Sequence, residues 1–436
     1  KGLSDLGIRT VVVDKDPQAT FSIELSELSP APIILNEDVT HPTALRAAGI
    51  GHAQCRGVIA VTENDHTNLK IAVGVKLLSP NTQVICRSEF EDEAANMASF
   101  GTDIIINPYH TFAKRVSQLT TAPDKHRLQS WFINQHSLEH INLEIARQGL
   151  PEGKWIICGF GRLGKSIWEI LTAVGIDVTV VDANPVESSS PTGTIKGRGT
   201  EAHTLVEAGV KEAKVIVAAS NDDANNLSIL ITARQLNSQI YSVGRVNEEA
   251  LHALYLEANS DYIMRRSQVV ANEVLTIISR PLVTKFLALA DQLDGEQTAQ
   301  LIKSIDSLTD NQNPVTWRLT LDRDQSPALA RIMEGGKSIS IADLLEFDAD
   351  GTEQQIPLYL ERAKPSKQTE GSEYASTQDI LLPSLDTHLE LGDQLLICHA
   401  KNRSPRAQKL ATQAELVESV LLGNRHHIPL LRWLSR

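Results

Sequence analysis

The chain has 436 residues, of which 42% are hydrophobic and only 4% aromatic, and it carries a formal net charge of −13 at pH 7. The excess of acidic residues excludes a typical nucleic-acid-binding protein, which presents a basic surface, and the length predicts two or three domains. The four cysteines are scattered without a Cys-x-x-Cys pair, so we expect reduced core thiols in a reducing compartment.

The first 115 residues alternate short hydrophobic strands with helices, which predicts a parallel sheet covered on both faces. We expect an irregular loop between the first two strands, and a helical connector at 116–152 after the last one. The predicted strands are 10–13, 33–35, 57–61, 83–87 and 103–106, and the predicted helices are 42–48, 65–78 and 91–100.

A second unit of the same kind is predicted over residues 153–275. It opens with a hydrophobic strand, Trp155-Ile-Ile-Cys158, that leads directly into Gly-Phe-Gly-Arg-Leu-Gly. A helical pattern and a second strand ending in Asp182 follow. This order of strand, glycine turn, helix, strand and acid is typical of a dinucleotide-binding fold.

Each part of this motif has a physical role. Gly159 permits a tight turn, Gly161 lets the backbone approach a pyrophosphate, and Gly164 lets the helix pack close to the strand. The helix N-terminus offers unpaired N–H groups to the phosphates. Asp182 is placed to accept hydrogen bonds from ribose hydroxyls and to repel the 2′-phosphate of NADP.

The two units are an internal repeat. The stretch ending in Asp14 matches the stretch ending in Asp182, 168 residues later, and the segment around Thr62 matches that around Ser220, 158 residues later. At these offsets the glycine motif would fall before Lys1. We therefore expect the first unit to lack its first strand in this chain, and the natural polypeptide to extend upstream.

After the second unit, residues 276–312 are predicted to form a helical crossover interrupted at Pro281, because proline inside a helix removes a hydrogen-bond donor. Residues 313–400 are predicted to form a small α+β domain with strands at 317–321, 358–362 and 395–399, and residues 401–436 a helical tail. The predicted fold class is α/β, with two Rossmann-like doubly wound parallel-sheet domains in tandem and a small C-terminal α+β domain.

The two repeated units resemble the RCK or TrkA-N domains, which regulate potassium channels and transporters. The resemblance covers roughly 1–115 and 153–275 and rests on the glycine motif, Asp182, the segment 219–227 and Arg245. It implies a regulatory ligand that is NAD(H) or an adenine nucleotide (ATP, ADP or AMP). Carried over by position, its binding residues are Gly159, Phe160, Gly161, Arg162, Leu163, Gly164, Asp182, Ala183, Ser220, Asn221 and Arg245, with Asp14 and Thr62 in the equivalent places of the first unit.

The resemblance also implies self-association into a dimer, tetramer or ring in the cytoplasm, at the inner face of the cell membrane. There the protein would control a potassium pore, carried upstream in the same polypeptide or on a separate subunit. Two adjacent units followed by one small domain resemble the tandem gating region of a potassium channel. A TrkA-type soluble subunit of a potassium transporter, the alternative within the family, would place a C-terminal subdomain between its two units.

The alternative from another class is an NAD-dependent oxidoreductase, which needs a proton-transfer residue beside the nicotinamide. The sequence has no Tyr-x-x-x-Lys pair, and His203 and His252 lie on helical patterns without an obvious carboxylate partner. We therefore expect no catalytic residue. No His or Cys cluster has the spacing of metal ligands, so no metal is expected, and the acidic chain is not expected to bind nucleic acid.

Overall fold

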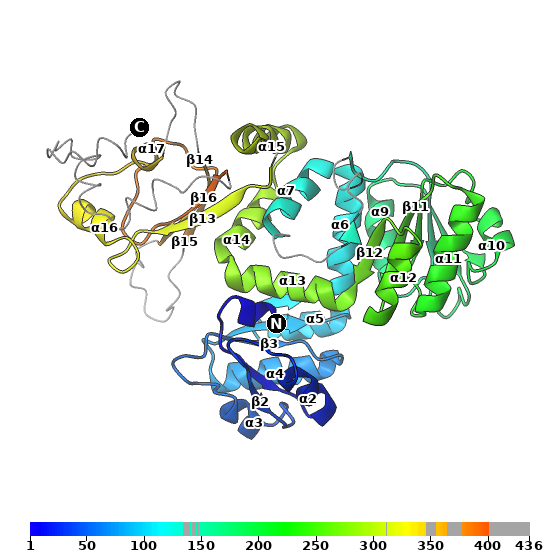
Figure 1. Ribbon diagram of the computed structural model, residues 1–436, viewed down its shortest axis with the longest axis horizontal. Helices are drawn as coiled ribbons and strands as arrows, with labels where there is room; N and C mark the ends of the chain where they lie inside the picture. The colour runs from blue at the N-terminus through cyan, green and yellow to red at the C-terminus, as the bar shows by residue number, and fades with distance from the viewer. Residues whose placement is uncertain are drawn as a thin grey trace. The chain divides into compact units, whose positions relative to one another are not determined.

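The computed structural model describes residues 1–133, 140, 141, 145, 148–310, 312–345, 355–363 and 377–400. They form two compact units. The first unit contains residues 1–127 and 133–279 and holds both repeats, and the second contains residues 128–132 and those from 280 onward (Figure 1). The predicted fold class is confirmed, because parallel sheets occupy the first unit and an antiparallel sheet the second. The helical tail predicted at 401–436 lies outside the described residues.

The second repeat is a doubly wound sheet in the order β6-β12-β11-β10-β7-β8-β9, in which every strand except the edge strand β6 is parallel. Helices cover both faces, so the central strands are hydrophobic and buried along their whole length. The strands are β6 (His140–Ile141), β7 (Trp155–Cys158), β8 (Val178–Asp182), β9 (Ile195–Lys196), β10 (Val215–Ala218), β11 (Tyr241–Val246) and β12 (Tyr262–Arg265). The helices are α9 (Arg162–Ala173), α10 (Ala202–Glu207), α11 (Asp223–Leu236) and α12 (His252–Glu257).

The first repeat has the equivalent strands in two separate sheets, β1-β2 and β3-β4-β5. In the second repeat, β7 joins the corresponding strands, whereas in the first no strand among the described residues joins β1 to β3. The strands are β1 (Val11–Val13), β2 (Ile33–Leu35), β3 (Gly57–Ala60), β4 (Gln83–Arg87) and β5 (Ile104–Ile106). The helices are α1 (Gly2–Asp5), α2 (Pro17–Glu24), α3 (Pro42–Ala47), α4 (Asp65–Leu78) and α5 (Glu91–Ser99).

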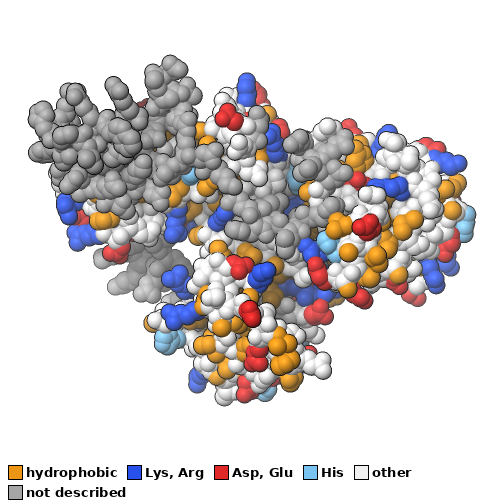
Figure 2. Space-filling model, viewed as in Figure 1, with side chains coloured by type: hydrophobic (Ala, Val, Ile, Leu, Met, Phe, Trp, Pro, Cys, Tyr) orange, Lys and Arg blue, Asp and Glu red, His pale blue; other side chains and the backbone are white. Residues whose placement is uncertain are grey.

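Helix α2 corrects the prediction of an irregular loop between the first two strands. Its capping residues specify it: the Asp16 side chain accepts a hydrogen bond from Gln18 N, and Pro17 occupies the first helical turn. Around it Phe21, Leu25 and Ile33 are exposed, and hydrophobic side chains gather on the surface of the first repeat, in the lower part of Figure 2.

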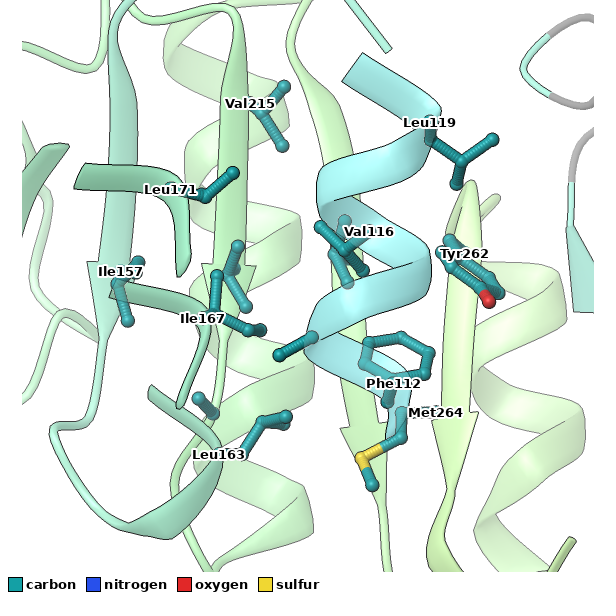
Figure 3. Packing of buried hydrophobic residues seen from close by; sticks show 14 of the residues in the cluster. Phe112, Val116, Leu119, Ile157, Leu163, Ile167, Leu171, Val215, Tyr262 and Met264 are labelled. Atoms are coloured by element: carbon teal, nitrogen blue, oxygen red, sulfur yellow. The ribbon is translucent and has the colours of Figure 1, made fainter. Parts of the chain in front are cut away.

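The two repeats exchange a helix. Helix α6 (Pro108–Thr121) follows β5 of the first repeat but packs on the sheet of the second, where Phe112 and Val116 join the cluster around Ile157 and Tyr262 (Figure 3). Helix α13 (Arg266–Ser279) follows β12 of the second repeat, and its buried Val270 and Val274 pack against Ile85 of β4 and Ile106 of β5 in the first. Helix α6, which runs into the helical connector predicted at 116–152, thus contributes to the core of the second repeat.

The second compact unit is built on an antiparallel sheet in the order β13-β16-β14-β15. The helix break predicted at Pro281 is confirmed, because α13 ends at Ser279 and α14 begins at Pro281. Strand β15 was not predicted. The strands are β13 (Val315–Thr320), β14 (Gln355–Ala363), β15 (Thr377–Leu381) and β16 (Gln394–His399), and the helices are the 128–132 part of α7 (Pro123–Ile133), α14 (Pro281–Ala290), α15 (Gly295–Thr309), α16 (Pro327–Glu334) and α17 (Ile341–Leu344).

The buried side chain of His126, near the start of α7, predicts a pH dependence of stability. Burial, with a smaller contribution from the charge of Arg115, lowers the pKa of His126 to about 4. In the unfolded chain its pKa is about 6.5, so between these values the unfolded state binds a proton that the folded state does not. Stability is therefore complete above pH 6.5 and falls as the pH falls to 4, by about 3 kcal/mol.

Urea denaturation at several pH values measures this effect. The variant His126→Leu is expected to lose the dependence, so that the stability of the wild type relative to the variant is constant above pH 6.5 and falls by about 3 kcal/mol as the pH falls to 4. A difference that does not change between pH 6.5 and 4 would contradict the assignment.

Candidate nucleotide-binding site

The glycine loop between β7 and α9 leaves open space where a pyrophosphate would lie. Gly159 has φ +97°, and a Cβ there would lie 2.9 Å from Ser220 N, so the turn requires glycine. A Cβ on Gly164 would overlap the carbonyl oxygen of Gly159, but one on Gly161 would meet no atom within 4 Å. Helix α9 begins at Arg162, and its first N–H groups have no partner within the helix.

Two residues of the loop serve the core through their side chains. Phe160 is buried with its ring edge-on to Trp168, 5.7 Å between ring centroids. Leu163 points into the hydrophobic cluster under the sheet, with Ile167 and Leu171 (Figure 3). Only the main chain at Phe160 and Leu163 is therefore available to a ligand.

Asp182 lies at the carboxyl end of β8, held against the glycine loop. One carboxylate oxygen accepts a hydrogen bond from Phe160 N at 2.7 Å and the other from Asn184 N at 2.8 Å. Since a carboxylate accepts about four hydrogen bonds, capacity remains for ribose hydroxyls. Ala183, the next residue, is exposed beside it.

Ser220 lies at the end of β10 in a turn fixed by the buried Asn226. The Asn226 amide oxygen accepts from Ser220 N at 3.0 Å and from Ser220 Oγ at 2.7 Å, and its NH₂ donates to Arg245 O at 3.1 Å. Thr62 and Asn68 form the same arrangement in the first repeat, at 2.9 and 2.7 Å. Asn68 and Asn226 therefore hold the turn in the same way in both repeats. They lie in the matched segments around Thr62 and Ser220, but the sequence analysis did not identify them as structural residues.

The first repeat keeps the acid as well as the turn. The Asp14 carboxylate accepts from Asp16 N at 2.9 Å, as Asp182 accepts from Asn184 N. The described residues of the first repeat contain no glycine loop beside it.

Arg245 is buried at the end of β11 and hydrogen-bonds two amides. Its Nη1 donates to Asn221 Oδ1 at 2.7 Å and its Nε to Asn247 Oδ1 at 2.9 Å. Its guanidinium lies 5.2 Å from the ring centroid of Tyr109, at the start of α6. Burial is the largest cause of the lowered pKa of Arg245, because the charged form loses water. Arg245 and Asn221 are thus in direct contact, and Asn226 binds both Ser220 and the carbonyl of Arg245.

Arg162 meets a residue that sequence reasoning did not find. Its guanidinium forms an ion pair with Glu89, which follows β4 of the first repeat. It also lies 5.2 Å from the ring centroid of Phe90 and 5.3 Å from that of Tyr109. Glu89 also pairs with Arg266, at 3.0 Å. No local pattern signals this contact, because the pairing of the two repeats brings Glu89 to the glycine loop.

The described residues hold neither a metal-binding cluster nor a membrane-spanning helix. Over the described ranges, no three His, Cys, Asp or Glu side chains gather closely enough to hold a metal ion. None of the helices within those ranges is both long and hydrophobic enough to cross a lipid bilayer.

Comparison with protein families gives a match to the TrkA-N domain at residues 1–108 and 155–266. Potassium channel protein 1 of Methanocaldococcus jannaschii is 25% identical over 187 residues, which is 41% of this chain and 56% of that protein. A Trk system potassium uptake protein TrkA homolog of Methanothermobacter thermautotrophicus is 30% identical over 152 residues, covering 32% of this chain and 69% of the relative.

Two solved structures extend the likeness in fold over nearly the whole chain. The GsuK channel bound to NAD has a TM-score of 0.51 at 16% identity, covering 95% of this chain and 76% of that one. The GsuK RCK domain has a TM-score of 0.50 at 14% identity, covering 95% and 92%. At these identities the likeness shows the fold alone.

Proposed function

Because the chain belongs to the TrkA-N domain family, we propose that it is a regulatory region that binds NAD(H) or an adenine nucleotide and couples this binding to potassium transport. It acts at the cytoplasmic face of a membrane, on a pore in the same polypeptide or on a separate subunit. The relatives named as potassium channel and potassium uptake proteins support this assignment.

The observation that carries the proposal is the glycine loop of the second repeat. The position of Gly161 is open, the carboxylate of Asp182 lies beside the loop, and the N-terminus of α9 points its N–H groups into the same space. Arginines 162 and 245 add positive charge at this edge. These are the groups that a pyrophosphate and an adenosine ribose require.

Within this family, the tandem arrangement favours the gating region of a channel. The two repeats follow each other along the chain, exchange helices α6 and α13, and precede one small antiparallel domain. A TrkA-type subunit is the second candidate, supported by the 30% identity to a TrkA homolog. In both the channel and the TrkA-type subunit, self-association of the regulatory regions would transmit the conformational change that the ligand causes. The ligand shifts the equilibrium between two conformations only by the difference in its affinity for them.

We propose no enzymatic activity for the site. A nicotinamide oxidoreductase needs an acid or base within hydrogen-bond reach of the substrate. His203 lies on α10 next to Thr204, and His252 begins α12, both away from the glycine loop in the sequence. The groups at the loop are instead arginines, amides and one carboxylate that is already held by backbone N–H groups.

Removal of the Asp182 carboxylate tests the proposal. Titration of NADH into the purified chain is expected to show binding, and Asp182→Ala to weaken it about tenfold or more, since a hydrogen bond to a charged group contributes about 1.5–3 kcal/mol. NADP, which brings a 2′-phosphate toward this carboxylate, is expected to compete poorly with NADH for the wild-type protein.

The matched control is Asp14→Ala, which removes the equivalent carboxylate of the first repeat, where the described residues provide no glycine loop. It is expected to leave NADH affinity unchanged. Equal affinities for wild type and Asp182→Ala would refute the ribose role of Asp182, and steady oxidation of NADH with a keto acid would refute the regulatory assignment.

A further inference from the structure

Glu89 is a buried carboxylate supplied by the first repeat to the glycine loop of the second. Its side chain is only 2% exposed, and it forms ion pairs with Arg87 of its own repeat and with Arg162 and Arg266 of the other. Arg162 is the first residue of α9, so its guanidinium stands where a phosphate would seek a positive partner. Glu89 thus occupies an arginine that an anionic ligand would also use.

Three arginines form ion pairs with Glu89, and a fourth, Arg245, lies at the same edge. Arg266 has a second partner in Glu63, at 2.7 Å, but Arg245, which is 4% exposed, forms no ion pair with a carboxylate of the described residues. Further carboxylates lie close by, because Asp65 accepts a hydrogen bond from Glu89 N and Asp223 accepts from Asn247, the partner of Arg245. A buried positive charge such as that of Arg245 is stabilised by a nearby anion, so this edge favours an anionic ligand of limited charge.

Two of these guanidinium groups, those of Arg162 and Arg245, contact the ring of Tyr109. The guanidinium carbons of Arg162 and Arg245 lie 5.3 and 5.2 Å from the ring centroid of Tyr109. Tyr109 belongs to the exchanged helix α6, which packs on α9. The two arginines and Glu89 therefore form one electrostatic group at the mouth of the glycine loop.

We propose that Glu89 is a specificity-determining residue of the second-repeat site, selecting a pyrophosphate diester over a nucleoside triphosphate. The inference rests on the proposed function. A dinucleotide brings about two negative charges and metal-free ATP about four, so ATP meets the stronger repulsion from a fixed carboxylate. Either ligand has to compete with Glu89 for Arg162, so the discrimination comes from the difference in charge between the two ligands.

Competitive titration of NADH and ATP in the presence of EDTA tests this specificity. The wild-type protein is expected to bind NADH about tenfold or more tightly than ATP, and Glu89→Gln to reduce that ratio about tenfold by strengthening ATP binding. The matched control is Glu63→Gln. Glu63 also pairs with Arg266, but its side chain is 83% exposed, so solvent screens its charge and the ratio is expected to stay at the wild-type value.

The results of these titrations separate the specificity role of Glu89 from the proposed function of the chain. A wild-type protein that prefers metal-free ATP to NADH overturns the specificity role, and this result needs no variant, so it holds even if Glu89→Gln does not fold. An unchanged ratio in a Glu89→Gln protein with the wild-type melting temperature overturns it as well. A wild-type protein that binds none of NADH, NAD, ATP, ADP and AMP overturns the proposed function itself.

Discussion

Replacing Gly164 by valine is expected to prevent the second repeat from folding, or to lower its stability by more than about 3 kcal/mol. A Cβ at this position would overlap the carbonyl oxygen of Gly159 and would lie 3.2 Å from Ile157 Cγ2 of the central strand. The carbonyl belongs to the backbone of a tight turn, so it cannot move aside as a flexible side chain would. The measurement is thermal unfolding followed by circular dichroism.

Gly161→Val is the matched control, because it places the same side chain three residues earlier. A Cβ at Gly161 meets no atom within 4 Å, and the residue has φ −78°, which any amino acid adopts. This variant is expected to melt as the wild type does but to lose NADH binding, because valine fills the space for the pyrophosphate. Unchanged NADH affinity in Gly161→Val would show that the ligand does not use this loop.

The sequence predicted the second repeat well because its signals are local. The strand at Trp155–Cys158, the three glycines and Asp182 lie in one continuous segment. The conformation and close packing of the backbone at Gly159 and Gly164 require glycine, so the motif can be recognised from the sequence of this segment alone. The alternation of strands and helices in the first repeat likewise predicted α4 and β4, and both are found at the predicted residues. Local chemistry of this kind specifies the element and its site together.

The partners of these elements were not predictable in the same way. Helix α6 has the hydrophobic face of any helix beside a sheet, and its sequence does not say which sheet it covers. Likewise Glu89 reads as an ordinary surface acid after a strand, and only the pairing of the repeats brings it to Arg162. The missed helix α2 had a readable signal, Asp16 followed by Pro17, that the length of the surrounding loop obscured.

Helix exchange links the two repeats into one folding unit. The glycine loop continues into α9, α9 packs on α6, and α6 begins immediately after the last strand of the first repeat. Helix α13 runs from the last strand of the second repeat onto the sheet of the first. We therefore expect a change at the loop to reach the first repeat through packed helices rather than through a flexible connector.

Truncation of Phe112 on α6 is expected to destabilise both repeats together. The side chain is 1% exposed, and its ring centroid lies 4.7 Å from that of Tyr262 on β12. Phe112→Ala removes this packing and leaves a cavity, a change that reduces stability by about 3–5 kcal/mol. Hydrogen exchange measured by mass spectrometry is expected to show faster exchange in β4 of the first repeat as well as in β7 of the second.

Phe100→Ala provides the control for this substitution, because Phe100 is 55% exposed at the end of α5. It makes the same chemical change outside the exchanged helices and is expected to alter stability by less than about 0.5 kcal/mol. If exchange in Phe112→Ala rises in β7 while β4 keeps its protection, the repeats unfold independently. Helix α6 would then be a component of one domain only, and it could not carry a signal from the glycine loop to the first repeat.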